Sequence, residues 1–540
     1  MKQLLVFISA LLIGLLGVIS SSFSQEIQWS NHAGGPGSEY GGSSVIDHEG
    51  NTYYSGIFCG NECYFQTDTL YQFGTNGIYL VKYDALGNEI WAKRIGGNTS
   101  EDVGQGFSDM VYDSTSNMIF CVGTISTTYN GVQNILTKLD TDGKIVWMKT
   151  YSGVSLFSGF SALTLNENKE IFITGSISTT VNFDTIQVLR GGFIAKFDSS
   201  GNCLWAKKKF GYDQISVSEV QTSGIKVVND KIFVSAYLAC DRTIFIDTIK
   251  IDHKGYGSSM IMCFDKECNI QWITEGISKM TYSYSDLAVD NASNLYYTGC
   301  FRDTISFSGN LLITWPGMKD FFLIKLDKDG MVQWLNQTRA SIAEGVDIIS
   351  DEGGNTYVTG YFKGHGTFGD YEITAQSNED IFLARYNTSG ECKGVINYPN
   401  GEGNGLSQDS DGNPSFIFIF EGTTTVGRNT YESYGATDFI FAKCSAITGL
   451  EEHQKNEQNT LLIYANPNTG KCNIIIPDEF KNDKNLRLQI FDNKGRLIQQ
   501  TAVEIVEDKI KLNIEAQARG MYTAILSNGK KNYSGKIVFE

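Results

Sequence analysis

The sequence predicts an all-β protein, namely a seven-bladed β-propeller followed by a small Ig-like β-sandwich. Three observations support this prediction. Aromatic residues reach 12%, with 57 Gly and only 6 Pro, which is typical of strands joined by glycine turns. Tryptophan recurs at intervals near sixty residues, and a hairpin motif recurs with it. The last part of the chain breaks this repeat and has short alternating strands of its own.

Residues 1–24 have the pattern of a secretory signal peptide. Lys2 provides the positive start, residues 4–19 are almost unbroken apolar sequence, and residues 22–24 (Ser-Phe-Ser) fit a small-x-small cleavage site. The mature chain is expected to begin near Gln25. No later apolar stretch is long enough to cross a bilayer, so no transmembrane segment is expected after cleavage.

The net charge of −17 argues against nucleic acid as a partner. Residues 461–540 carry 12 Lys and Arg against 9 Asp and Glu, so the acidity belongs to the earlier part of the chain. An acidic surface repels phosphate backbones, and no basic stripe offsets it. With five His and no Cys–His set at zinc spacing, no metal or other cofactor is predicted.

Eleven Cys in an exported chain are compatible with disulfides. Cys59 and Cys63 are close enough in the sequence for a local bridge, and so are Cys263 and Cys268. The sequence leaves the connectivity open.

Six tryptophans mark the repeat, with separations of 62, 56, 58, 67 and 62 residues. Gly394 stands 60 residues after the last of them, and Trp315 lies off the pattern. Each tryptophan after Trp29 is preceded by an apolar strand that ends in Lys-x-Asp or its equivalent and by a turn. We expect the six rings at equivalent places, one in each blade and wedged between neighbouring blades: Trp29, Trp91, Trp147, Trp205, Trp272 and Trp334.

A second hairpin lies earlier in the repeat. It has the form Asp-x-x-Gly-Asn at residues 47–51, 351–355 and 409–413, and Asp-x-x-Ser-Asn at residues 290–294. In both kinds of hairpin, Asp is expected to cap its own turn and Gly to take a positive φ. Each repeat thus offers four strands, which is the content of a propeller blade. Counting the Lys-x-Asp strand or its equivalent gives seven blades over residues 25–446.

The two ends of the repeat array are incomplete in complementary ways. Residues 26–29 form a fourth strand without its first three, and the last repeat stops after Lys443 without a Trp strand. An unpaired edge strand promotes aggregation, so pairing the two ends is favoured. We expect residues 26–30 to pair antiparallel with about 439–444 and to complete the last blade.

The combined motif resembles the SBBP family of bacterial β-propeller repeats over roughly residues 27–446. The sequence departs from it at Cys263, which replaces Lys, at Gly394, which replaces Trp, and in weak first hairpins of repeats three and four. The resemblance implies an extracellular propeller and no reaction. Quinoprotein and WD propellers fit less well, because their repeats are nearer forty residues long.

Residues 447–459 are polar and aperiodic, which predicts a linker, and residues 460–540 predict a small antiparallel sandwich. The latter resemble the type A C-terminal sorting domain of the type IX secretion system of Bacteroidota. The resemblance implies the secretion machinery as a partner and a location at the outer cell surface or in the medium. Its landmarks are, in chain order, Asn466, Pro467, Gly470, Asp492, Gly495, Gly520, Tyr522 and Lys536.

No catalytic motif stands out from the repeat, and no catalytic residue is assigned. The chain is therefore expected to be a non-catalytic binding or adhesion module for an extracellular glycan or protein. The alternative is a secreted carbohydrate-active hydrolase or lyase with carboxylates in the propeller channel. Such chemistry needs two carboxyl groups at a defined separation, which a sequence does not supply.

Overall fold

The computed structural model divides into two compact parts, Met1–Gly449 and Leu450–Glu540. The predicted signal peptide, residues 1–24, lies outside the described residues. In the part of the chain that is described, no helix is long and apolar enough to span a membrane. The described residues are 27–71, 76–95, 102–127, 131–152, 159–211, 220–238, 243–247, 249–252, 257–281, 286–315, 317–446, 461–464, 468–477, 480–481, 483, 486–491, 497–503, 509–528 and 532–539.

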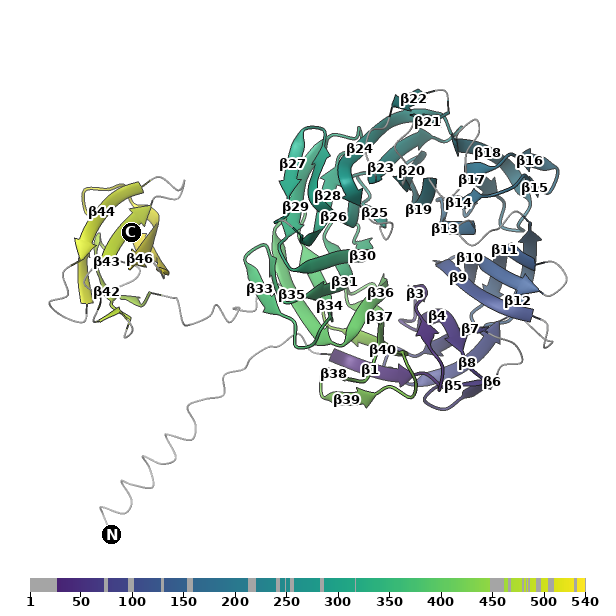
Figure 1. Cartoon of the computed structure of the whole chain (residues 1–540), viewed down its shortest axis with the longest axis horizontal. Helices are drawn as coiled ribbons and strands as arrows, with labels where there is room; N and C mark the ends of the chain where they lie inside the picture. The colour runs from purple at the N-terminus through teal and green to yellow at the C-terminus, as the bar shows by residue number, and fades with distance from the viewer. Residues whose placement is uncertain are drawn as a thin grey trace, which may run out of the picture. The chain divides into compact units, whose positions relative to one another are not determined.

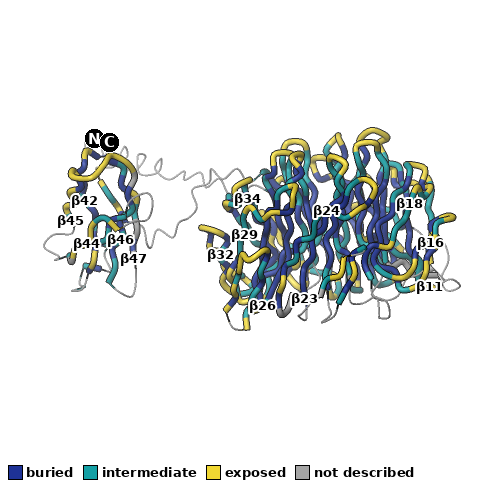
Figure 2. Tube along the Cα trace, turned by 90° about the horizontal axis from the view of Figure 1, so that it is seen from above, coloured by how far each residue is buried: buried dark blue, intermediate teal, exposed yellow. Residues whose placement is uncertain are grey.

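In the first part, sets of four antiparallel strands are arranged around a centre, which is a β-propeller (Figure 1). Figure 2 shows buried residues along the strands and exposed residues at the turns. The sets, called repeats 1 to 7 below, are β3 (Ser44–Ile46), β4 (Thr52–Cys59), β7 (Asn76–Tyr83) and β8 (Glu89–Ile95); β9 (Asp102–Asp113), β10 (Met118–Thr127), β11 (Gly131–Asp140) and β12 (Ile145–Tyr151); β13 (Gly159–Leu165), β14 (Ile171–Ile177), β17 (Gly191–Phe197) and β18 (Cys203–Gly211); β19 (Val220–Val228), β20 (Lys231–Leu238), β23 (Gly257–Asp265) and β24 (Ile270–Thr281); β25 (Leu287–Val289), β26 (Leu295–Phe307), β28 (Lys319–Leu326) and β29 (Val332–Thr338); β30 (Ile342–Ser350), β31 (Thr356–Lys363), β34 (Asp380–Tyr386) and β35 (Cys392–Pro399); and β36 (Gly401–Gln408), β37 (Pro414–Phe420), β40 (Asp438–Cys444) and β1 (Ile27–Ala33).

Shorter strands form hairpins between the second and third strands of a repeat, and one further strand, β2 (Glu39–Tyr40), pairs with β4. The short hairpin strands are β5 (Glu62–Tyr64) with β6 (Thr69–Tyr71), β15 (Val181–Phe183) with β16 (Ile186–Val188), β21 (Thr243–Ile246) with β22 (Ile249–Asp252), the end of β26 with β27 (Asn310–Ile313), β32 (His365–Phe368) with β33 (Tyr371–Thr374), and β38 (Thr423–Val426) with β39 (Asn429–Glu432).

The Asp-x-x-Gly-Asn turns have the predicted bonding. Asp47 Oδ1 accepts the backbone N–H groups of Glu49 and Asn51 at 2.9 and 3.0 Å, and Gly50 has φ +82°. Asn51 Nδ2 donates to Asp47 Oδ2 at 2.8 Å, which completes a side-chain clasp across the turn. The weak first hairpin of repeat 4 is instead a two-residue turn, Asn229–Asp230, with both φ angles positive, as a type I′ turn requires.

The six repeat tryptophans occupy one register. Each pairs across the sheet with the residue at the Lys position of Lys-x-Asp, and Gly394 pairs with Arg385 in the same way. Only the Trp29 side chain is buried, and the other five are half-buried. The pairs are Trp29 with Lys443, Trp91 with Lys82, Trp147 with Lys138, Trp205 with Lys196, Trp272 with Cys263 and Trp334 with Lys325.

Each ring packs against the turn glycine of the following repeat. A Cβ atom on Gly201, which has φ +80°, would lie 2.9 Å from the ring of Trp147, so this turn accepts no side chain. Gly87, Gly143, Gly330 and Gly390 meet the tryptophan of the preceding repeat in the same way. In repeat 4 the glycine is replaced by Cys268, at φ +66°, in the apolar cluster that Trp205 contacts.

The lysines of Lys-x-Asp reach the same turns. Lys325 Nζ donates to the carbonyl of Thr388 at 3.1 Å, and Trp334 Nε1 donates to that oxygen at 3.0 Å. Where Cys263 replaces the lysine, Lys231 on the neighbouring strand donates to the carbonyl of Lys328 at 2.6 Å. Each of these turns is therefore fixed by the preceding repeat.

Trp147→Ala is expected to lower the free energy of unfolding by about 2–3 kcal/mol, because a half-buried indole leaves a gap over Gly201. Denaturant unfolding of the purified protein measures this loss. The control is Trp315→Ala, at an exposed side chain, which is expected to change stability by less than about 0.5 kcal/mol. Equal losses in the two variants would contradict the packing role of the repeat tryptophans.

The predicted pairing of the two ends is confirmed. Strand β1 pairs antiparallel with β40, from Ile27 opposite Cys444 to Ala33 opposite Phe439. The chain then crosses to repeat 1 through Gly34–Gly37, where a Cβ on Gly35 would lie 2.1 Å from the carbonyl oxygen of Glu62. Backbone hydrogen bonds join Gly34 to Tyr64 of β5 and Gly37 to Ala436, just before β40.

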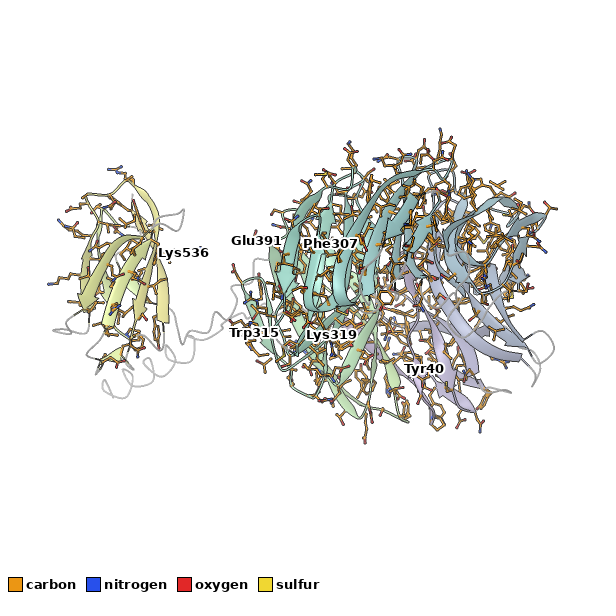
Figure 3. The ribbon with its side chains drawn as sticks, turned by 45° about the horizontal axis from the view of Figure 1, so that its top comes forward. Tyr40, Phe307, Trp315, Lys319, Glu391 and Lys536 are labelled. Atoms are coloured by element: carbon orange, nitrogen blue, oxygen red, sulfur yellow. The ribbon has the colours of Figure 1, made fainter. Side chains whose placement is uncertain are left out.

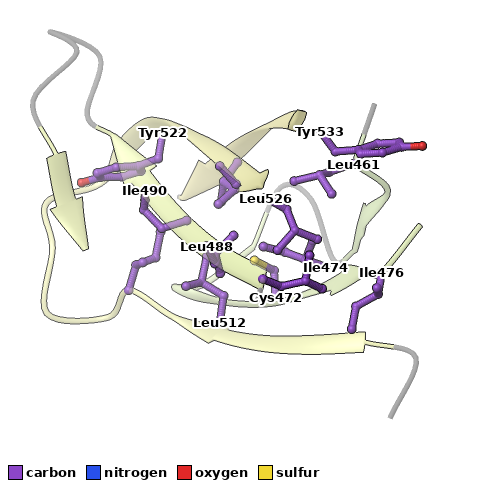
Figure 4. Close-up of a cluster of buried hydrophobic side chains, with 14 of the residues drawn as sticks. Leu461, Cys472, Ile474, Ile476, Leu488, Ile490, Leu512, Tyr522, Leu526 and Tyr533 are labelled. Atoms are coloured by element: carbon purple, nitrogen blue, oxygen red, sulfur yellow. The ribbon is translucent and has the colours of Figure 1, made fainter. Parts of the chain in front are cut away.

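The second part is a small β-structure with two sheets, and apolar side chains from both form one buried cluster (Figure 4). Leu488, Ile490 and Leu526 of one sheet share it with Ile474 and Leu512 of the other. The strands are β41 (Ile463–Tyr464), β42 (Lys471–Ile475) and β45 (Lys509–Asn513), and β43 (Leu486–Phe491), β44 (Leu497–Val503), β46 (Gly520–Ser527) and β47 (Asn532–Phe539).

The two local disulfides that the sequence allows do not form in the structure. Cys59 and Cys63 are free thiols, as are Cys263 and Cys268. Cys263 and Cys268 instead lie in the apolar core, each in a different cluster.

Candidate functional site: a carboxylate-lined channel

The first strand of each repeat lies at the centre of the ring (Figure 1). One position of this first strand pairs with the same position of the second strand in every repeat, but its amino acid differs between repeats. In chain order it is Ser43, Asp109, Ala162, Gly224, Asp286, Asp347 and Gly405. A cavity of about 260 Å³ lies between these strands, and the three aspartates line it together with several serines.

Two of the aspartates tie neighbouring repeats together. Asp109 Oδ2 accepts the backbone N–H of Leu163 in the next repeat at 3.0 Å. Asp347 Oδ2 accepts the N–H of Leu406 at 2.6 Å in the same way. Charge-assisted bonds of this kind to backbone N–H groups are stronger than neutral ones.

Burial shifts the protonation of these acids. It raises the pKa of Asp109 to about 6 and that of Asp286 to about 8, and it also raises the pKa of Asp347. Asp286 and Asp347 hydrogen-bond to each other, so Asp286 holds a proton near neutral pH and donates it to Asp347.

Lys226 of repeat 4 supplies a positive charge to this cluster. Burial lowers its pKa, but the charges of Asp286, Asp109 and Asp347 outweigh burial, so the net shift is upward. Gly224 makes room for the neighbouring acid, because a Cβ there would lie 2.6 Å from Asp286 Oδ1. The channel therefore combines a proton donor, carboxylates and an ammonium group, which can hold a polar ligand or exchange protons with it.

A second acidic cluster lies at the junction of the two chain ends. His32 Nε2 lies 2.6 Å from Asp438 Oδ2, and the Tyr434 ring stacks on the imidazole at 4.5 Å. Glu39 is fully buried, and its carboxyl group lies in hydrogen-bond contact with that of Asp438. Burial, and then the charge of Asp438, raises the pKa of Glu39 to about 9, so Glu39 is neutral at physiological pH.

Glu39→Gln is expected to raise the melting temperature near about pH 8 and to change it less near about pH 5. The folded pKa of Glu39 lies above the ordinary value of 4.5, so its contribution to stability is complete below that value and falls as pH rises toward 9. Glutamine is neutral throughout and keeps the shape of the acid. Thermal melts across this pH range measure the difference, with Glu421→Gln, at an exposed side chain, as the control. If the melting temperatures of the two variants changed with pH in the same way, the raised pKa of Glu39 would be contradicted.

A hollow of about 420 Å³ lies between repeats 3 and 4. It lies beside the short Asn229–Asp230 turn of repeat 4. Glu170 and Lys196 form an ion pair of 2.7 Å in its wall, so these two charges are already matched. Among the described residues, no group of three or more His, Cys, Asp or Glu could hold a metal ion.

Four of the predicted sorting landmarks are strand or turn residues of the second part. Gly470 has φ +96° beside Glu515, and Gly520 has φ +154°. Tyr522 is buried and donates to the carbonyl of Ala518, and Lys536 is exposed on β47. Asn466, Pro467, Asp492 and Gly495 lie outside the described residues.

Comparison with known families bears on this second part. Residues 462–540 match the family described as secretion system C-terminal sorting domain. The chain carries a sorting domain. The sorting domain directs export by the type IX secretion system to the cell surface or the extracellular space, and its partner is that machinery.

Matches to the rest of the chain are distant. An uncharacterized WD repeat-containing protein, L264 of Acanthamoeba polyphaga mimivirus, is 26% identical over 226 residues, which are 35% of this chain and 16% of that protein. The chain thus spans less than a fifth of that relative.

Three solved structures are also similar. They are the Dos1 propeller (9% identity, TM-score 0.34, 74% of this chain and 81% of that one), a subtype N10 neuraminidase-like protein of A/little yellow-shouldered bat/Guatemala/060/2010 (10%, 0.33, 78% and 100%) and the phage phi92 endosialidase (10%, 0.37, 94% and 87%). At this level of similarity they bear on neither ligand nor activity.

Sequence reasoning missed the channel aspartates, although the repeat contains a signal for them. Asp109, Asp286 and Asp347 each stand four residues before the first residue of a hairpin turn, where the other repeats have small residues. An alignment of the repeats on that turn finds the position. That it faces a channel follows only from the closed ring.

Proposed function

We propose that the protein is an exported, non-catalytic seven-bladed β-propeller that binds an extracellular glycan or protein. The proposal assigns residues 1–24 to a signal peptide, 25–446 to an SBBP-type propeller, 447–459 to a linker and 460–540 to an Ig-like type A sorting domain of Bacteroidota. The four-stranded sets and the pairing of β1 with β40 support one blade for each repeat.

The observation that favours binding over catalysis is the use of the channel acids. Asp109 and Asp347 accept backbone N–H groups of the next repeat, and Asp347 also bonds to Asp286. Two carboxyl groups in hydrogen-bond contact are nearer than the ~5 Å or more that separates a glycosidase pair. The acids therefore stabilise the contacts between repeats. Recognition is left to the short hairpins between the second and third strands of the repeats, which we call the rim hairpins.

The test is a glycan and protein array probed with the exported full chain. Binding is expected to survive Asp286→Asn, because this change keeps the shape and the hydrogen bond of a protonated acid. It is expected to be lost when the exposed residues of a rim hairpin, such as β32–β33, are replaced by serine. The proposal would be contradicted if Asp286→Asn lost binding while every rim hairpin variant still bound the ligand.

The second candidate is a secreted hydrolase or lyase, and the pKa of about 8 for Asp286 favours it, because a carboxyl group protonated at neutral pH can act as a general acid. Release of reducing ends or unsaturated products from a polysaccharide panel tests it. Activity that falls at least about a hundredfold in Asp286→Asn would support this candidate.

A further inference from the structure

The rim hairpins share one outward-facing position, which allows them to be compared residue by residue. It is the residue of the outer hairpin strand that pairs with the residue just before the last buried side chain of the inner arm, and its own side chain is exposed in every case. Those buried side chains are Phe65, Phe183, Ile246, Phe307, Phe368 and Val426. Five of the six described hairpins place a polar residue there, and only the hairpin of repeat 5 places an aliphatic one. The residues are Thr69, Gln187, Lys250, Leu311, Glu372 and Thr430.

The apolar character of this hairpin extends to its neighbours. Leu311, Ile313 and Trp315 alternate outward along one segment and are 55, 56 and 65% exposed, whereas Thr314 between them is buried. Ile277 on β24 is 52% exposed and lies in the same row, because Ser306 pairs with both Ile277 and Leu311. We call these four residues the apolar rim, and Figure 3 labels Trp315.

The apolar rim differs from ordinary exposed aliphatic residues, which are scattered singly. Its side chains expose roughly 400 Å² together, which is as large as the largest apolar patch of a typical monomer, and such patches are often functional. It includes the tryptophan that the blade repeat does not use, and an exposed tryptophan is the side chain most enriched at binding hot spots.

We propose that the apolar rim is a self-association surface, through which two copies of the chain pack face to face across a two-fold axis. A net charge of −17 makes two copies repel each other, and the four residues of the apolar rim carry no charge. An uncharged apolar face is also complementary to itself, as a two-fold interface requires.

The area sets the strength of the dimer. Two such faces bury roughly 800 Å² in total, which is less than the ~1,200 Å² of a stable complex, so the dimer is reversible. Because the net negative charges of the two copies repel each other, salt strengthens the association by screening them. An interface held by ion pairs would weaken in salt instead.

Sedimentation velocity of the exported full chain, from about 1 to about 500 µM and at low and high salt, tests the proposal. The wild type is expected to dimerise with concentration, and more strongly at high salt. Leu311→Glu, which copies the residue at the same position in repeat 6, and Trp315→Ser are each expected to weaken the dimer at least about tenfold.

The matched control is Leu189→Glu, at a 58% exposed leucine on the rim hairpin of repeat 3. It is expected to leave the dimer unchanged, and equal melting temperatures show that all three variants fold. A wild type that stays monomeric throughout, a dimer insensitive to Leu311→Glu, or an equal effect of Leu189→Glu would each overturn the proposal.

Discussion

A chain that ends at residue 459 is expected to fold normally and to remain in the periplasm. The sorting domain has its own apolar core, and its described strands form two sheets of their own. Its removal therefore leaves every described propeller ladder intact and takes away only the export signal. Cell fractionation with immunoblotting measures the location, and circular dichroism of the periplasmic protein measures folding.

Two controls make this result specific. The full chain with Trp315→Ser is expected to reach the surface or the medium normally, because that residue lies outside the sorting domain. Residues 460–540 fused to an unrelated periplasmic protein are expected to carry it out. Normal surface levels of the truncated chain would show that export does not depend on this segment.

Deleting residues 25–33 is expected to lower the melting temperature by about 5–10 °C and to produce oligomers. The deletion removes the β1–β40 ladder, the buried Trp29 ring against Gly87 and the His32–Asp438 contact. It also exposes the edge of β40, whose residues are all buried in the complete protein. Thermal melts and size-exclusion chromatography with light scattering measure the two effects.

A synthetic peptide with the sequence of residues 25–33 supplies the control. Added in excess to the shortened chain, it is expected to raise the melting temperature and to suppress the oligomers. The same peptide with Trp29→Ala is expected to restore less. An unchanged melt after the deletion would mean that β1 contributes nothing to the closed ring.

Much of the propeller could be predicted because its signals are local. The Asp-x-x-Gly-Asn turns and the register of the tryptophans depend on neighbours within a few residues or one strand away. The role of Lys231 could not be predicted, because it compensates for Cys263 on the neighbouring strand. Nor could that of Cys268, which replaces a turn glycine and lies in the apolar cluster that Trp205 contacts. The channel acids were missed for a similar reason, since their mutual effects arise only after distant repeats meet.

The structure explains why glycine stands at position 394 in place of the repeat tryptophan, which the repeat pattern alone does not explain. Each repeat tryptophan packs on the turn between the third and fourth strands of the next repeat. Repeat 7 has no such turn, because its fourth strand is β1 from the other end of the chain. A tryptophan at 394 would have no turn to pack on, so its loss in repeat 6 follows from the closure.

The pairing of β1 with β40 also changes how the protein can unfold. In an open array of repeats the terminal members have one neighbour each, so they fray first and stability falls repeat by repeat. Here Trp29 links the last repeat to Gly87 of the first, which leaves no terminal repeat. Separating β1 from β40 therefore releases a contact between residues some four hundred positions apart, and that gain in chain entropy is available only once, at this break.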